Sequence, residues 1–159
     1  MDGNEIRTAI RDFLGLLEND GLSVVQAEEK LPALLDHLAF TQSCVLFTYD
    51  NTDYPDAPDQ NYDELRAAVT KRFPNYGYYN VAEKITTDIG DSGTLVGDAI
   101  DDLADIARDL YEVEWYWSNT SEANALFHFV NDFNHHWGQH LRGLQLYLDA
   151  LELDRDVAE

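Results

Sequence analysis

The sequence predicts an all-α fold, an up-and-down helical bundle in which shorter N-terminal helices precede two long antiparallel C-terminal helices. Apolar residues recur at spacings of three and four in at least four segments, as they do on one face of a helix. No stretch alternates apolar and polar residues in the manner of a half-buried strand. Only residues 118–120 separate the last two helical patterns, so we expect these two helices to lie side by side.

The N-terminal part predicts three helices. Residues 4–18 carry one apolar face, formed by Ile6, Ile10, Phe13, Leu14 and Leu17. Ser23 followed by Gln26 predicts a capping box at the start of a short second helix. Pro32 suits the first turn of a third helix, which we place at 32–47. Because this third segment is apolar on two sides, it should be largely buried.

The rest of the chain begins with a surface loop at 49–61, which contains Pro55 and Pro58 among Asp and Asn residues. Helical periodicity returns at 62–73, and a short helix is expected at 78–89 before a glycine-containing loop. Two long helices follow at 95–117 and 121–153. The pattern predicts one helical-bundle domain over residues 1–159.

The formal net charge is −21, since ten Lys and Arg residues face thirty-one Asp and Glu residues. Such a chain repels nucleic acid and anionic lipid, so we expect no direct nucleic-acid binding. Three interpretations of the acidity remain open. It can be a solvated face that keeps the protein soluble, an adaptation to high salt, or an acidic face that docks a basic protein partner or mimics nucleic acid.

Location is predicted from three absences in the sequence. Cys44 is the single cysteine, so no internal disulfide can form. The N-terminal residues lack the basic and apolar regions of a signal peptide, and no apolar run is long enough for a membrane span. We therefore expect a cytoplasmic protein without a membrane segment. The sequence does not indicate the oligomeric state.

Acidic residues form a strip along the helix predicted at 95–117. Placed at 100° per residue, the carboxylates occupy an arc separate from the apolar arc. This strip could hold a divalent cation or receive a basic partner, and it could equally be a solvated helix face. The candidate partner-binding residues are Asp98, Asp102, Asp105, Asp109 and Glu112.

Histidines gather on the last helix. His136 and His140 lie four residues apart, which lets two imidazoles share a metal from one helix face. Asp132 precedes them on the same flank, and it could supply a third ligand, as could His37 or a carboxylate of the neighbouring helix. The alternative is that these histidines are structural and form hydrogen bonds at the edge of the core.

Trp137 and Gly138 are expected to be structural. A glycine in the middle of a helix costs about 1 kcal/mol relative to alanine. Close approach of another helix backbone over Gly138, with Trp137 packed beside it, would offset this cost. No phosphate-binding loop, nucleophile elbow or zinc-type cysteine set occurs, so no catalytic residue and no organic cofactor is predicted.

Three stretches resemble a bacterial family known as domain of unknown function 5063. They are YDEL at 62–65 with the tyrosines at 78–79, DLADI at 102–106 followed by DL at 109–110, and NAL at 124–126 followed by Phe133 and the Trp137-Gly138 pair. Ala107 stands where the family usually has an aromatic residue. The resemblance covers roughly residues 60–150, and it implies a compact helical domain without implying an activity.

A second resemblance is to DinB-like metal-binding four-helix bundles. The run HHWGQ at 135–139 resembles the His-His-x-Gly-Gln end of those proteins, and LLDHL at 34–38 resembles an earlier helix that supplies another histidine. By this resemblance His37 and His136 would be metal ligands. Asp132 stands where that family has a histidine.

Two functions therefore follow as expectations. The first is a non-catalytic bacterial protein that acts by binding a basic protein through the acidic strip. The second is a divalent-metal-binding bundle that uses His37, Asp132, His136 and His140, with hydrolase or thiol-transferase chemistry.

Overall fold

The computed structural model describes residues 1–158 and is mostly helical, with one small antiparallel sheet. Its elements are, in chain order, α1 (Gly3–Glu18), α2 (Val24–Ser43), α3 (Tyr62–Arg72), β1 (Tyr78–Ala82), β2 (Thr94–Asp98), α4 (Ala99–Asn119), α5 (Glu122–Asp132), the π-helical turn η1 (Phe133–Trp137) and α6 (Gly138–Ala158).

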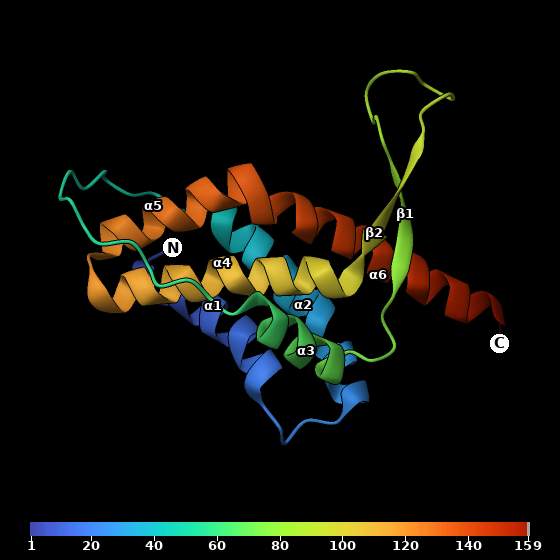
Figure 1. The fold of residues 1–159 in the computed structure, drawn as a ribbon, viewed down its shortest axis with the longest axis horizontal. Helices are drawn as coiled ribbons and strands as arrows, with labels where there is room; N and C mark the ends of the chain where they lie inside the picture. Colours follow the sequence, from blue (N-terminus) through green and yellow to red (C-terminus); the bar gives the residue numbers. More distant parts are fainter. Residues whose placement is uncertain (159) are drawn as a thin grey trace.

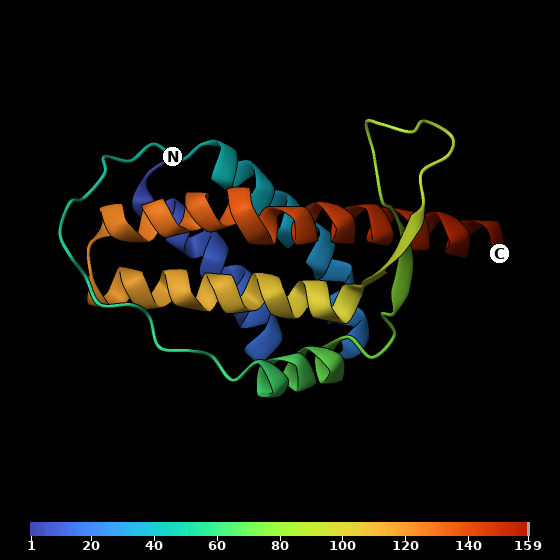
Figure 2. The same ribbon diagram turned by 45° about the horizontal axis from the view of Figure 1, so that its top comes forward.

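The long helix α4 lies antiparallel beside the continuous run of α5, η1 and α6, as the short joint between them predicts (Figure 1). Helices α1 and α2 cross behind this pair and contact α4 and α6, respectively (Figure 2). Helix α3 packs along α4, and the β1–β2 hairpin projects from the helical body. The predicted helical bundle is therefore correct in outline.

The core is formed by apolar side chains from every helix. Its largest fully buried members include Phe13 of α1, Leu35 of α2, Leu110 of α4 and Trp137 of η1. Each side chain of this size stabilises the fold by about 1.5–3 kcal/mol when it is removed from water. The packing of these side chains thus determines which faces of α4 and α6 meet. It also determines the positions of the polar residues beside that contact.

The structure corrects the division of the N-terminal region into a short second helix and a third helix at 32–47. Ser23 and Gln26 do form the predicted capping box, but α2 continues through Pro32 and ends at Ser43. Proline inside a helix removes one backbone hydrogen bond. Here Leu31 and Leu35 are fully buried on either side, and this packing holds the helix together.

The structure also contains two strands that the sequence analysis did not predict. Residues 78–82 form β1 instead of the start of a helix, and β2 replaces the first turn of the helix expected at 95–117. Tyr78 pairs with Asp98, and Ala82 pairs with Thr94. Segments this short give little periodicity, so tertiary contacts decide their conformation. The fold is therefore not purely all-α.

The closing helix is not regular, because η1 interrupts it with a wider turn. A Cβ atom on Gly138 would lie 2.3 Å from the carbonyl oxygen of Phe133, which belongs to the same helix. Gly138 is therefore needed to close the π turn on its own backbone. The atoms nearest to that position belong to Phe133 of the π turn, which helical periodicity alone does not reveal.

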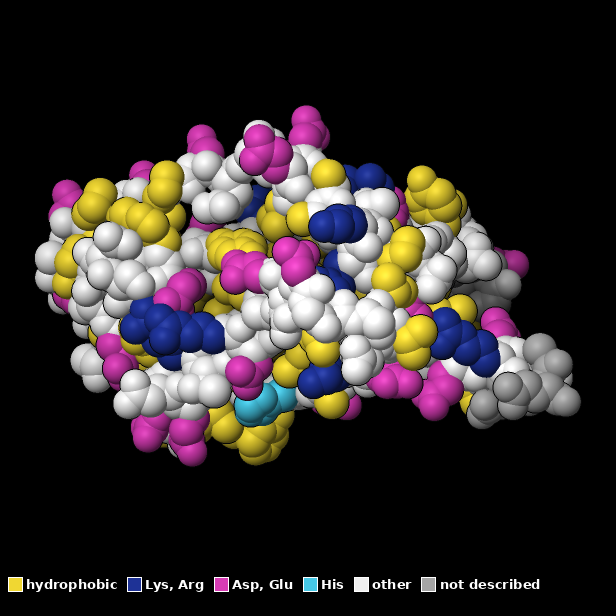
Figure 3. Space-filling view, turned by 90° about the horizontal axis from the view of Figure 1, so that it is seen from below, with side chains coloured by type: hydrophobic (Ala, Val, Ile, Leu, Met, Phe, Trp, Pro, Cys, Tyr) yellow, Lys and Arg dark blue, Asp and Glu magenta, His cyan; other side chains and the backbone are white. Residues whose placement is uncertain are grey.

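The face of the molecule shown in Figure 3 carries both signs of charge. Lys and Arg side chains lie there in several groups between acidic and apolar side chains. Among the helices described for residues 1–158, none has the length and apolar character required to cross a membrane.

Candidate metal centre

Three carboxylates of the acidic strip are buried where α4 meets α6. Asp102, Asp105 and Asp109 are only 8%, 9% and 7% exposed. Spacings of three and four residues place all three on one side of α4. These three residues are thus not part of a solvated face. A buried carboxylate requires partners, because an unpaired charge is strongly disfavoured away from water.

Two of these carboxylates each hold one histidine of the facing helix run. Nδ1 of His140 lies 2.7 Å from Oδ1 of Asp102, and Nδ1 of His136 lies 2.6 Å from Oδ2 of Asp109. A carboxylate can only accept a hydrogen bond, so each Nδ1 carries the proton. The lone pair of each neutral imidazole is then on Nε2. This Asp–His pairing is how proteins orient histidines that ligate a metal.

The third carboxylate, that of Asp105, lies close to both imidazoles. Oδ2 of Asp105 is 3.6 Å from Nε2 of His140. Ligand atoms of Asp105, His136 and His140 all lie within 4.8 Å of one another. Two ligands held about 2.1 Å from a tetrahedral ion are about 3.4 Å apart. The three side chains therefore approach the geometry of a metal site. We call these three residues with Asp102 and Asp109 the α4–α6 cluster.

Arg108 supplies positive charge to the same cluster. Its guanidinium lies 3.0 Å from Oδ1 of Asp105 and 3.5 Å from Oδ1 of Asp109. The same group is 3.4 Å from Nε2 of His136. Arg108 also stacks over the ring of Tyr62, with 5.5 Å from the guanidinium carbon to the ring centroid.

A further layer of contacts supports Asp102. The hydroxyl of Tyr79 in β1 donates to Asp102, and a Cβ on Gly143 would lie 2.6 Å from that hydroxyl oxygen. Gly143 in α6 thus leaves room for the hairpin tyrosine to reach α4. Burial, together with the negative charge of Asp102, raises the pKa of Tyr79. The hydrogen bond that His140 donates to Asp102 raises the pKa of His140, although burial opposes the shift.

An open cleft of about 760 Å³ reaches the cluster at His136. The rings of Tyr116 and His128 stack at 3.9 Å along its wall. Glu112 also lines the cleft, and burial, followed by the charges of Asp109 and Asp132, raises the pKa of its carboxyl. A small molecule can therefore approach His136 from solvent, through an acidic and partly aromatic entrance.

The structure does not bring all the proposed ligands together. His37 is exposed on α2, and within residues 1–158 the group of three ligands contains neither His37 nor Asp132. Asp132 instead lies 3.7 Å from Nδ1 of His128. The π turn falls between Asp132 and His136, so the simple four-residue spacing that linked Asp132 to the histidines does not hold.

The other residues of the acidic strip have different surroundings. Asp98 caps the N-terminus of α4 and pairs with Arg66 at 2.7 Å. Glu112 is half-buried in the cleft. The sequence pattern allowed a carboxylate of the neighbouring helix as a ligand, but it did not distinguish Asp105 from the other carboxylates for that role. The sequence pattern also did not indicate roles for Arg108 and Tyr79. Gly143, in the middle of the last predicted helix, was the feature that could have indicated a close contact at that point of α6.

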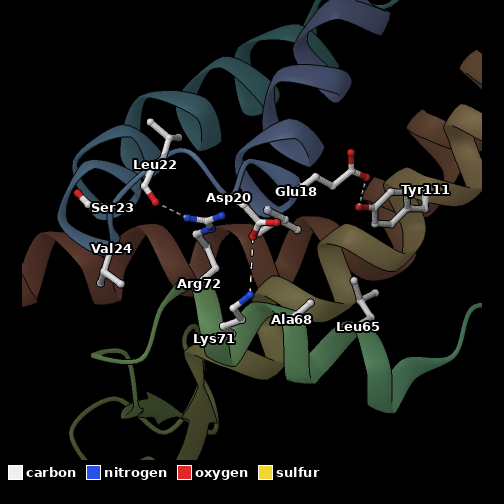
Figure 4. A pocket seen from close by; sticks show the side chains of 11 residues that line it. Glu18, Asp20, Leu22, Ser23, Val24, Leu65, Ala68, Lys71, Arg72 and Tyr111 are labelled. Carbon is white, nitrogen blue, oxygen red and sulfur yellow. Dashed lines mark hydrogen bonds and ion pairs between the residues drawn. The ribbon is translucent and has the colours of Figure 1, made fainter.

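A second cleft, of about 680 Å³, lies between α3 and the turn that joins α1 to α2 (Figure 4). Arg72 points into it and is 8% exposed. Its guanidinium donates to the backbone carbonyls of Leu22 and Asn19. These bonds tie the turn to α3, which explains the burial of this arginine in structural terms.

Comparison with known proteins places the chain in a family. It is similar to protein BF1032 from Bacteroides fragilis, a structural genomics target solved by crystallography, with a TM-score of 0.72 and 18% identity over 93% of this chain and 90% of that chain. At this identity the similarity establishes the fold. No curated protein matches the chain. Residues 3–153 match the family described as "Domain of unknown function (DUF5063)", and the chain belongs to that family.

Proposed function

We propose that this DUF5063 protein binds a divalent transition-metal ion through Asp105, His136 and His140. One observation carries the proposal: both histidines are held at Nδ1 by buried aspartates, and Asp105 lies 3.6 Å from the Nε2 of His140. Two oriented imidazoles beside a third carboxylate are typical of a metal site.

The chemistry of the three ligands favours particular ions. Imidazole nitrogens suit Zn²⁺, Ni²⁺ and Fe²⁺, whereas Mg²⁺ and Ca²⁺ prefer sites made of oxygen alone. Three protein ligands leave a coordination position for water or a substrate, as in catalytic zinc sites. The cleft at His136 gives that position a route to solvent. Activation of water or of a thiol at the ion is the reaction type that such a site supports.

A basic protein partner on the acidic strip has less support. Asp102, Asp105 and Asp109 face α6 and are satisfied within the chain, and Asp98 serves as a helix cap. A docking surface needs carboxylates that a partner can reach. Of the five candidates, Glu112 is the one whose acidic group is half-buried and lines an open cleft.

The proposal is tested by metal analysis of untagged protein, combined with calorimetric titration of chelator-treated protein with ZnCl₂ and NiCl₂. We expect a single equivalent to bind to the wild type, and His136→Ala and His140→Ala each to weaken binding by more than about 100-fold. The matched control is His135→Ala, because His135 is exposed in the same turn and bonds to the carbonyl of Asn131. If the wild type does not bind either ion, or if the control weakens binding equally, the proposal is wrong.

A further inference from the structure

We propose that Arg108 is the internal counter-ion of this site, which an incoming metal must displace, and that it thereby sets the affinity and selectivity of the site. The inference rests on the proposed metal function and adds a residue that does not ligate the ion. Arg108 lies on α4, the helix that carries Asp105 and Asp109.

The guanidinium of Arg108 contacts groups that the metal would need. It lies 3.0 Å from Oδ1 of Asp105 and 3.4 Å from Nε2 of His136. A guanidinium is only a donor, so its N–H points at the imidazole lone pair that a metal would use. Two positive charges at this spacing also repel each other strongly in a half-buried site. Arg108 in this position and a bound metal are therefore mutually exclusive.

The side chain of Arg108 has a place to go when it is displaced. It is 32% exposed and lines the open cleft. Glu112, Asp132 and Asp59 line the same cleft, so the displaced guanidinium would enter an acidic environment. Its stacking on Tyr62 can persist while the terminal nitrogens rotate away from Asp105.

Displacement has a consequence for selectivity. The ion must outcompete the ion pair between Arg108 and Asp105 and the contact between Arg108 and His136. Ions with high affinity for imidazole, such as Zn²⁺ and Ni²⁺, can do so, whereas Mn²⁺ binds imidazole more weakly. Removal of the Arg108 charge should therefore strengthen binding of every ion and bring Mn²⁺ into a measurable range.

The test compares Arg108→Gln with Arg142→Gln, a matched control at an exposed arginine of α6 whose partner is Gln145. Chelator-treated proteins are titrated with ZnCl₂, NiCl₂ and MnCl₂. We expect Arg108→Gln to bind Zn²⁺ at least about tenfold more tightly than the wild type, and Arg142→Gln to match the wild type. Wild-type protein that binds Zn²⁺ together with an Arg108→Gln variant that binds no more tightly would overturn the inference and leave the metal site intact.

A measurement on the wild type covers the case in which the variant folds poorly. The side-chain Nε–H signal of Arg108 in a nitrogen–proton correlation spectrum should shift when Zn²⁺ is added, while that of Arg142 stays in place. An unchanged Arg108 signal in protein saturated with Zn²⁺ would contradict the inference. Failure of the wild type to bind Zn²⁺ and Ni²⁺ would instead refute the proposed function, and the inference with it.

Discussion

Asp109 and Glu114 lie in adjoining turns of α4, but their partners differ. Asp109 holds the imidazole of His136. Glu114 accepts hydrogen bonds from the guanidinium groups of Arg7 and Arg11 in α1, and we call these three residues the Glu114 cluster. The distances are similar, at 2.6 Å for each of these contacts.

The difference lies in what each partner leaves available. Arginine has donors only and stays charged, so a carboxylate bound to two arginines is neutralised and has no further chemistry. Histidine keeps a second nitrogen, and an aspartate on one nitrogen orients the other toward a ligand. The two ion-pair clusters on α4 thus differ in their contacts: the Glu114 cluster joins α1 to α4, and the α4–α6 cluster holds the Nε2 of His140 at 3.6 Å from Asp105.

The largest effect on stability should come from Glu114→Ala. This change leaves Arg7 half-buried without its carboxylate, and we expect a loss of about 2 kcal/mol in the free energy of unfolding, since Arg11 is more exposed and contributes less. Urea unfolding of metal-free protein measures it. Glu152→Ala, at an exposed position of α6, is the control. Equal losses in the two variants would show that the Glu114 cluster has no structural role.

Asp109→Asn should separate the two clusters by function. Asparagine keeps the shape but loses the charge that holds the Nδ1 proton of His136, so Zn²⁺ affinity should fall by about 10–100-fold. Glu114→Gln, the matched change in the other cluster, should leave the affinity unchanged. Calorimetric titration gives both values. A similar affinity in both variants would remove the distinction between the clusters.

Tyr79→Phe tests how far the support of the α4–α6 cluster extends. The change removes the hydroxyl that donates to Asp102, and we expect a loss of about 1 kcal/mol in the free energy of unfolding. Tyr78→Phe is the control, because Tyr78 is in the same strand and is 74% exposed. If both variants unfold like the wild type, the hairpin does not support Asp102.

The smallest effect is a dependence on pH in the Glu114 cluster. Hydrogen bonds from Arg7 and Arg11 lower the pKa of Glu114 below its ordinary value of 4.5, although burial opposes this shift. The stability that Glu114 contributes is therefore present above the ordinary value and is lost as pH falls through the lowered pKa. The difference in unfolding free energy between wild type and Glu114→Gln should shrink between about pH 5 and pH 3. A constant difference would contradict this assignment.

Much of the fold could be predicted from the sequence. The apolar periodicity located α1, α3 and the antiparallel pair of long helices, and Ser23 with Gln26 located the start of α2. These features depend on neighbours within a few residues, which is why local pattern reveals them. The strands β1 and β2 and the π turn were missed, because each depends on contacts with other segments, such as Tyr79 against Gly143.

The candidate site, like the fold, could be predicted from the sequence only in part. The sequence by itself determined that His136 and His140 share one side of a helix and that α4 carries a row of carboxylates. Only the tertiary structure decided that Asp102, Asp105 and Asp109 face the histidines, that Arg108 lies among them, and that the group of three ligands contains neither His37 nor Asp132. A helical pattern fixes angles around one axis, whereas the facing of two helices is set by the packing of side chains such as Leu110 and Trp137 between them.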